Sequence, residues 1–110
     1  MDNREKRNNL RLDKLFPVSL SHPLFGRLRL LARNVSAGGM FVETADPLPL
    51  GSEVKVHFAS GEIEIVARAE VRNHYFLNYA DRSGPRALAG MGLRFLGFEA
   101  GADWVKRLVH

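Results

Sequence analysis

The sequence predicts a mainly all-β fold, a small six-stranded antiparallel barrel, on three observations. Short apolar runs alternate with polar residues at a period of two, which is typical of strands that bury one face. Residues that favour turns recur at short intervals between these runs, and no long amphipathic helix intervenes. Closure into a barrel also removes the exposed strand edges that a chain of 110 residues has little material to cover.

The N-terminal half supplies an arm and three of the expected strands. Residues 1–14 are almost entirely polar or charged and are expected to form a flexible basic arm, whereas residues 15–110 form a single domain. Strands are expected at residues 16–20 and 27–30, the second with arginines on one face and leucines on the other. A third short strand at residues 40–44 follows a pair of glycines.

The C-terminal half contains the clearest alternation. Between residues 52 and 72, apolar and polar residues alternate on both sides of Ser60 and Gly61, which predicts a long antiparallel hairpin with one solvated face. Residues 73–86 mix aromatic and turn-forming residues and are expected to be a strand end followed by an exposed loop. A final strand is expected at residues 91–95, and apolar residues four apart after Gly101 predict a short C-terminal helix.

Composition excludes several classes of protein. The chain has no cysteine, which excludes a disulfide framework, a cysteine nucleophile and cysteine-based metal sites. No apolar run approaches the roughly 18 residues of a membrane span, and the N-terminus lacks the apolar stretch of a signal peptide, so we expect a cytoplasmic protein without membrane insertion. The four histidines show no metal-ligand spacing and Ser36 has no local base, so neither a metal site, a cofactor nor an enzyme is predicted.

The net charge of +4 is concentrated near the N-terminus. Residues 1–34 carry eight Lys or Arg against three Asp or Glu, whereas residues 35–110 carry eight against nine. Twelve of the sixteen basic residues are arginines, whose planar guanidinium forms paired hydrogen bonds with phosphates and guanine edges. This charge favours an anionic partner. Within it, Arg27, Arg29 and Arg33 either raise the local positive potential or are ordinary solvent-facing strand residues.

Two local patterns carry candidate ligand contacts. Arg7 and Arg11 are separated by three residues in the arm, a spacing that by itself also fits a solvated charge cluster. Residues 34–39, with the sequence Asn-Val-Ser-Ala-Gly-Gly, join the second and third expected strands. A tight turn explains this composition, because Asn and Gly tolerate left-handed backbone angles. Alternatively, its amide, hydroxyl and bare glycine backbone offer contacts that a phosphate or a base can approach closely.

In combination these patterns resemble the PilZ domain family. Arg-x-x-x-Arg is followed by Asn-x-Ser-x-x-Gly and then, in the last strand, by Gly-x-x-Phe at residues 92–95. The resemblance spans about residues 4–98 and implies a barrel that acts as a receptor for the bacterial second messenger cyclic di-GMP. It implies that the arm folds over the ligand and that the Asn-Ser-Gly motif lies on the adjacent barrel surface. The implied ligand-binding residues are Arg7, Arg11, Asn34, Ser36, Gly38 and Gly39, with Lys6 and Arg33 as secondary candidates.

The chemistry of these side chains suits that ligand. Cyclic di-GMP carries two phosphate charges and two guanines, and a guanidinium can pair with phosphate oxygens, bond guanine O6 and N7, or stack on a base. Asn34 can bond a guanine edge. If the arm is disordered without ligand, its ordering consumes part of the binding energy and supplies a conformational signal to a downstream protein partner.

Two other functions stay open at this point. A PilZ-like barrel can act as a protein-interaction module without ligand, and residues 75–79 are either such a contact surface or the packed aromatic end of a hairpin. A small nucleic-acid-binding barrel fits the basic surface, but Phe41, Phe58 and Phe95 lie in strand patterns where burial is expected instead of base stacking.

The chain is expected to be a monomer or a weak homodimer. Control of motility, biofilm formation, pili, polysaccharide export or secretion would all fit a receptor of this kind.

Overall fold

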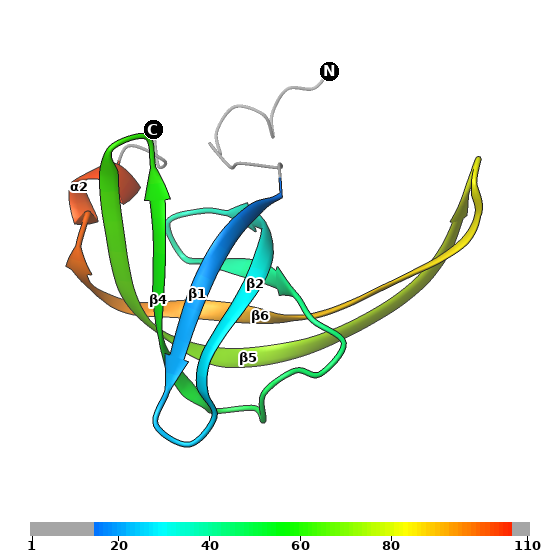
Figure 1. Cartoon of the computed structure of the whole chain (residues 1–110), viewed down its shortest axis with the longest axis horizontal. Helices are drawn as coiled ribbons and strands as arrows, with labels where there is room; N and C mark the ends of the chain where they lie inside the picture. Colours follow the sequence, from blue (N-terminus) through cyan, green and yellow to red (C-terminus); the bar gives the residue numbers. More distant parts are fainter. Residues whose placement is uncertain (1–14, 107–110) are drawn as a thin grey trace.

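The computed structural model describes residues 15–106, in which six antiparallel strands close into a barrel (Figure 1). The order around the barrel is β1-β2-β3-β6-β5-β4, so the first and fourth strands complete the ring. The predicted barrel is therefore confirmed, while the predicted arm at residues 1–14 lies outside the described residues. The elements are β1 (Phe16–His22), β2 (Gly26–Val35), β3 (Gly39–Glu43), β4 (Glu53–Ser60), β5 (Ile63–Asp81), β6 (Gly84–Ala100) and α2 (Ala102–Lys106).

The alternation seen in the sequence places one face of every strand inside the barrel. In β4, Val54, Val56 and Phe58 are buried while Lys55 and Ala59 are exposed. Such period-two burial is what a closed sheet of this size requires, because its interior is filled by side chains. All six strands contribute to the largest fully buried side chains, which are Leu20, Val35, Val42, Val56, Ile65, Val71 and Met91.

The short helix α2 packs against an aromatic group at one end of the barrel. The ring of Trp104 meets Phe58 edge to face, with the ring centroids 5.7 Å apart, and Phe58 also contacts Phe16 at 5.6 Å. Both Trp104 and Phe16 are partly buried against the core. The predicted C-terminal helix is thus confirmed from Ala102 to Lys106.

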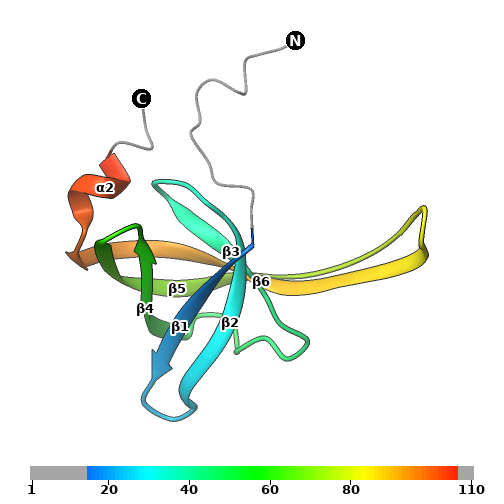
Figure 2. The same cartoon turned by 45° about the horizontal axis from the view of Figure 1, so that its top comes forward.

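The prediction of a strand end and an exposed loop at residues 73–86 is wrong. β5 continues to Asp81, and β6 starts at Gly84 and pairs with it over its whole first half. Residues 73–81 and 84–89, which we call the hairpin arm, project sideways from the barrel as a curved two-stranded ribbon (Figures 1 and 2). The sequence shows no alternation of apolar and polar residues here, because neither face of the hairpin arm is turned toward the core. Every residue from 72 to 81 is exposed.

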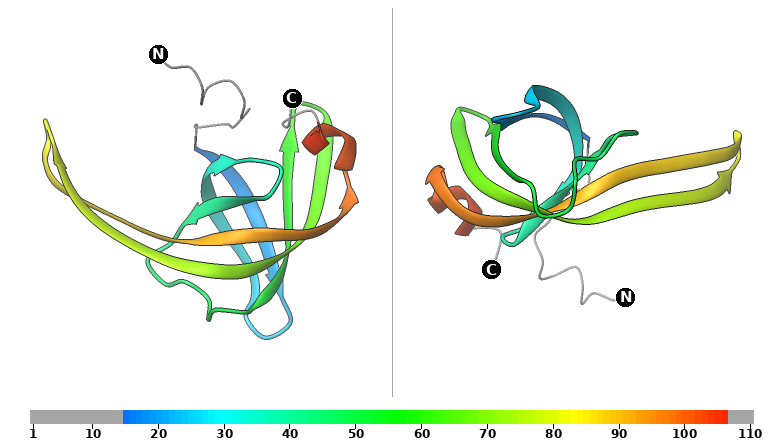
Figure 3. Two further views of the ribbon diagram at one scale, coloured as in Figure 1. Left: turned by 180° about the vertical axis from the view of Figure 1, so that it is seen from behind. Right: turned by 90° about the horizontal axis from the view of Figure 1, so that it is seen from below.

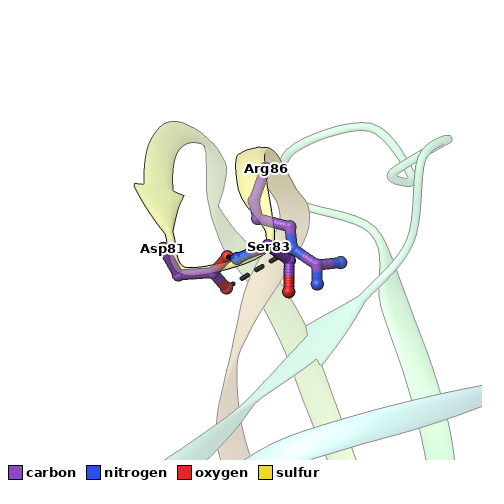
Figure 4. Close-up of polar contacts among 3 residues, drawn as sticks. All are labelled: Asp81, Ser83 and Arg86. Atoms are coloured by element: carbon purple, nitrogen blue, oxygen red, sulfur yellow. Dashed lines mark hydrogen bonds and ion pairs between the residues drawn. The ribbon is translucent and has the colours of Figure 1, made fainter.

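The tip of the hairpin arm is a tight turn held by one carboxylate. Asp81 Oδ1 accepts a hydrogen bond of 2.8 Å from the Ser83 backbone nitrogen, and its side chain lies 3.4 Å from Nε of Arg86 (Figure 4). Gly84 has a φ of 110°, a conformation that residues with a Cβ rarely adopt. The turn-forming residues of the sequence therefore build a two-residue hairpin connection in place of a longer loop.

Candidate ligand-binding site

A surface cavity of about 840 Å³ lies where the β2–β3 turn meets the base of the hairpin arm. It contains Arg33, Asn34, Ser36, Gly38 and Gly39, so the described members of the sequence-predicted site line one space. β3 and β6 lie side by side at this place, and the arm leaves the barrel next to them (Figure 2). The remaining lining residues are Met40, Phe41, Arg72, Asn73, Tyr75, Phe76, Leu77, Leu88, Gly92, Leu93 and Arg94.

A β-bulge in β2 brings two neighbouring side chains to this cavity. The pairing of β2 with β3 shifts register between Ala32 and Asn34, so Arg33 is the extra residue. Ala32 and Val35, on either side of the pair, are both fully buried. A regular strand would alternate and turn either Arg33 or Asn34 inward, whereas the bulge lets both line the outer cavity.

The segment at residues 36–39 is a turn pinned to β6. The Ser36 nitrogen donates to the Gly39 carbonyl at 2.9 Å, and the Phe95 nitrogen donates to the Gly38 carbonyl at 2.9 Å. The Gly38 nitrogen lies 3.4 Å from Ser36 Oγ, which accepts from it. Within residues 15–104, the Asn34 side chain makes no hydrogen bond to another residue. The turn interpretation of this segment is confirmed, and it leaves the Asn34 amide available.

The left-handed backbone offered as a reason for the two glycines is wrong. Neither Gly38 nor Gly39 has a positive φ. A Cβ at Gly39 would instead overlap the carbonyl oxygen of Leu93 on β6, whereas a Cβ at Gly38 would meet no atom within 4 Å. Gly39 is therefore needed for the close approach of β3 and β6, and Gly38 is free of that constraint.

Three guanidinium groups surround the cavity, in different states of pairing. Arg33 is held by Glu43 on β3, whose Oε2 lies 2.7 Å from both Nε and Nη2. Arg72 Nη1 stands 3.8 Å from Glu70, a long ion pair between exposed groups. Arg94 forms no ion pair with any carboxylate of residues 15–104. The positive charge at this cavity is thus only partly neutralised, which favours an anionic occupant.

Aromatic residues form the wall on the side of the hairpin arm. Phe41 and Tyr75 meet edge to face with centroids 5.5 Å apart, and both line the cavity. The expected burial is confirmed for Phe58 in the core, and Phe95 is partly buried against it. It is wrong for Phe41, because its neighbours Met40 and Val42 point inward and leave it on the outer face.

Arg72, Arg94 and Tyr75 were not among the residues predicted from the sequence. Arg94 stands inside the Gly-x-x-Phe element, but Arg72 looked like an ordinary residue of a solvated strand face. They reach the cavity through the pairing of β6 with both β3 and β5, where Gly39 lies opposite Arg94 and Phe41 opposite Gly92. Arg27 and Arg29 are exposed on β2 and do not line this cavity.

The described part of the chain offers neither a cluster of metal-ligating side chains nor a membrane-spanning helix. Over residues 15–106, no group of three or more His, Asp or Glu side chains could hold a metal ion. No helix in that range is both long and apolar enough to cross a membrane.

The fold and the cavity define a small closed β-barrel with a basic, partly aromatic binding surface on its outside. The chain belongs to the PilZ domain family, whose model matches residues 5–109. The resemblance seen in the sequence is therefore confirmed. A search of curated proteins found no match.

Two solved structures share the fold. The chain is similar to the PilZ domain of YcgR from Escherichia coli with c-di-GMP, with a TM-score of 0.64 and 18% identity over 94% of this chain and 86% of that one. It is also similar to the inhibitor of motility MotI/DgrA from Bacillus subtilis, with a TM-score of 0.65 and 25% identity over 99% of this chain. The match covers 53% of the second structure, so the chain spans about half of that protein's length.

The remaining predicted contacts lie outside the described residues. Lys6, Arg7 and Arg11 fall within the range matched by the family model, but the structure describes the chain only from Leu15. Their roles stay predictions.

Proposed function

We propose that this chain is a PilZ-type receptor that binds cyclic di-GMP in the cavity beside the β2–β3 turn. The observation that carries the proposal is that the Asn34, Ser36 and Gly39 motif lines the same cavity as three only partly neutralised arginines and an aromatic wall. The arginines suit the phosphates, the polar side chains of the motif suit a guanine edge, and the aromatic wall suits the face of a guanine ring. The cavity also falls within the roughly 300–1,000 Å³ of small-molecule sites.

The lining residues divide naturally among the parts of the ligand. Asn34 bonds a guanine edge through its free amide, and the Ser36 hydroxyl contacts a phosphate or base. Arg72 and Arg94 balance phosphate charge from the β5 and β6 side, and Tyr75 offers a ring for base stacking. Arg7 and Arg11 then close over the ligand from the N-terminal segment. Ordering of that segment is the signal passed to a protein partner in the cytoplasm, and similarity to an inhibitor of motility makes motility the first pathway to test.

Calorimetric titration with cyclic di-GMP tests the assignment. We expect wild-type protein to bind and Asn34→Ala or Ser36→Ala each to weaken affinity about 5- to 100-fold, because each leaves a polar group of the bound ligand without its hydrogen-bond partner, at a cost of roughly 1–3 kcal/mol. Ser60→Ala is the matched control, since Ser60 is the last residue of β4 and does not line the cavity. Unchanged affinity in both site variants would refute these contacts.

The same titration separates the alternative functions. A mixed-sequence oligonucleotide is titrated in parallel at rising salt, because a protein that binds the nucleic-acid backbone releases counterions and this release becomes less favourable as the salt concentration rises. Binding of the oligonucleotide alone, with a steep salt slope, would favour the nucleic-acid-binding barrel. Absence of binding to either ligand would leave the protein-interaction module as the remaining function and contradict the receptor proposal.

A further inference from the structure

The hairpin arm has an unpaired edge along β5. β4 pairs with β5 only as far as Glu70, and the Ser52 backbone then bonds Val71. Beyond this point, β5 pairs with β6 alone among the described residues. A two-stranded ribbon is at best marginally stable by itself. This one continues two barrel strands and is contacted near its base by Phe41, but farther out no other described strand lies beside it (Figure 3). A further strand along β5 would therefore stabilise the arm.

The two edges of the arm are protected to different degrees. On the β6 edge, Pro85 removes a hydrogen-bond donor, Arg86 adds a charge, and the Thr44 nitrogen donates to the Ala89 carbonyl at 3.0 Å. The β5 edge, residues 73–80, contains no proline, lysine, arginine or carboxylate. Charges and prolines are the usual means by which edge strands avoid pairing with another chain. His74 Nε2 lies 2.7 Å from the Leu48 carbonyl oxygen, so the β5 edge is open to such pairing from Tyr75 outward.

We propose that a second copy of this chain pairs with that edge, β5 against β5, around a two-fold axis through Leu77. In this antiparallel register, Tyr75 lies opposite Tyr79 of the partner subunit and Asn73 lies opposite Asp81 of the partner subunit. Aromatic pairs directly opposite each other stabilise antiparallel strands, and the register places no like charges opposite each other between residues 73 and 81. The two ribbons become one four-stranded sheet with the closed two-fold symmetry usual for dimers.

The exposed apolar surface supports a weak dimer. Tyr75, Phe76, Leu77 and Tyr79 are 49%, 71%, 54% and 44% exposed. These side chains project from the two faces of the strand, so pairing at its edge covers their flanks and the strand backbone but leaves the faces open. The buried area therefore stays below the roughly 1,200 Å² of standard specific interfaces. The dimer is therefore expected to form and dissociate with concentration.

The pairing also reaches the cavity described above. Tyr75 and Leu77 line that cavity, and directly opposite side chains in such a ladder stand about 5 Å apart. Tyr79 of the partner subunit would then border the wall of the cavity. The dimer itself does not depend on ligand, so it can be tested with the protein alone.

Sedimentation velocity over a concentration series of the full chain measures the dimer. We expect a reversible monomer–dimer equilibrium in the wild type. Leu77→Lys and Leu77→Glu should each raise the dimer dissociation constant at least tenfold, because each puts two like charges opposite one another, while an equimolar mixture of the two restores dimers. Leu24→Lys is the matched control: Leu24 is 84% exposed in the β1–β2 turn, outside the arm, and the variant should dimerise like the wild type.

A cysteine cross-link tests the register independently of the charged variants, even if one of these fails to fold. Because the chain has no cysteine, Leu77→Cys introduces a single thiol that the two-fold axis brings next to its copy. Oxidation should yield a disulfide-linked dimer for Leu77→Cys and none for Leu24→Cys at the same concentration. A wild type that stays monomeric at its highest soluble concentration, or equal cross-linking of both variants, overturns the proposal and leaves the edge to a different partner.

Discussion

Replacing Arg7 and Arg11 together by alanine is expected to weaken cyclic di-GMP binding at least 100-fold, on the order of 3 kcal/mol or more. Each guanidinium is proposed to form charge-assisted hydrogen bonds with the ligand, and such bonds contribute about 1.5–3 kcal/mol each. The cavity on the barrel is open to solvent on the side away from the strands, so the arginines would supply the contacts that cover the ligand. Calorimetry on the double variant measures the loss.

The pair Arg27 and Arg29 supplies the control for net charge. Replacing both by alanine also removes two positive charges, but these lie on an exposed face of β2 that does not line the cavity. We expect less than a fewfold change in affinity, mainly through the weaker long-range potential. If the two double variants lose affinity equally, overall charge and not a specific clamp explains binding.

Gly39→Ala is expected to lower the stability of the barrel by about 1–3 kcal/mol, the usual range when a side chain is forced into a packed site. The added Cβ would overlap the Leu93 carbonyl oxygen and push β3 away from β6. For a domain of this size, that corresponds to a fall in the midpoint of thermal unfolding of roughly 5–20 °C. Circular dichroism during heating measures it.

The adjacent glycine is the matched control. A Cβ at Gly38 meets no atom within 4 Å and its φ is not positive, so Gly38→Ala should unfold within a few degrees of the wild type. Equal loss of stability in the two variants would contradict the assignment of Gly39 to strand packing.

Much of the fold could be predicted because a barrel interior imposes a strict alternation. β4 and the first half of β5 face the core on one side only, so residues 54–58 and 63–71 carry the period of two into the sequence. The hairpin arm could not be predicted in this way. Its strands leave the barrel after residue 72, and with both faces exposed no alternation is selected. Residues 75–79 include types that favour strands, but all five are exposed, so no alternation of apolar and polar residues marks them as a strand.

The residues of the candidate site could likewise be predicted only in part. Asn34, Ser36 and Gly39 could be predicted because they form a local motif in one turn. Arg72, Arg94 and Tyr75 join them only through the register of β3 with β6 and of β6 with β5, which includes a shift between Val71 and Asn73. Such a bulge changes which side chains face outward, and the sequence does not mark its place. The outward position of Phe41 follows from the same geometry.

The most direct test of the receptor proposal is an amide-resolved NMR titration of the full chain with cyclic di-GMP. We predict that the resonances of residues 34–39 and those of Arg7 and Arg11 shift together and saturate at one ligand concentration, and that amide exchange slows over residues 1–14. The residues of the β1–β2 turn around Leu24 should stay unchanged. Saturating ligand that shifts neither group, or shifts only residues outside the cavity, would contradict the proposal.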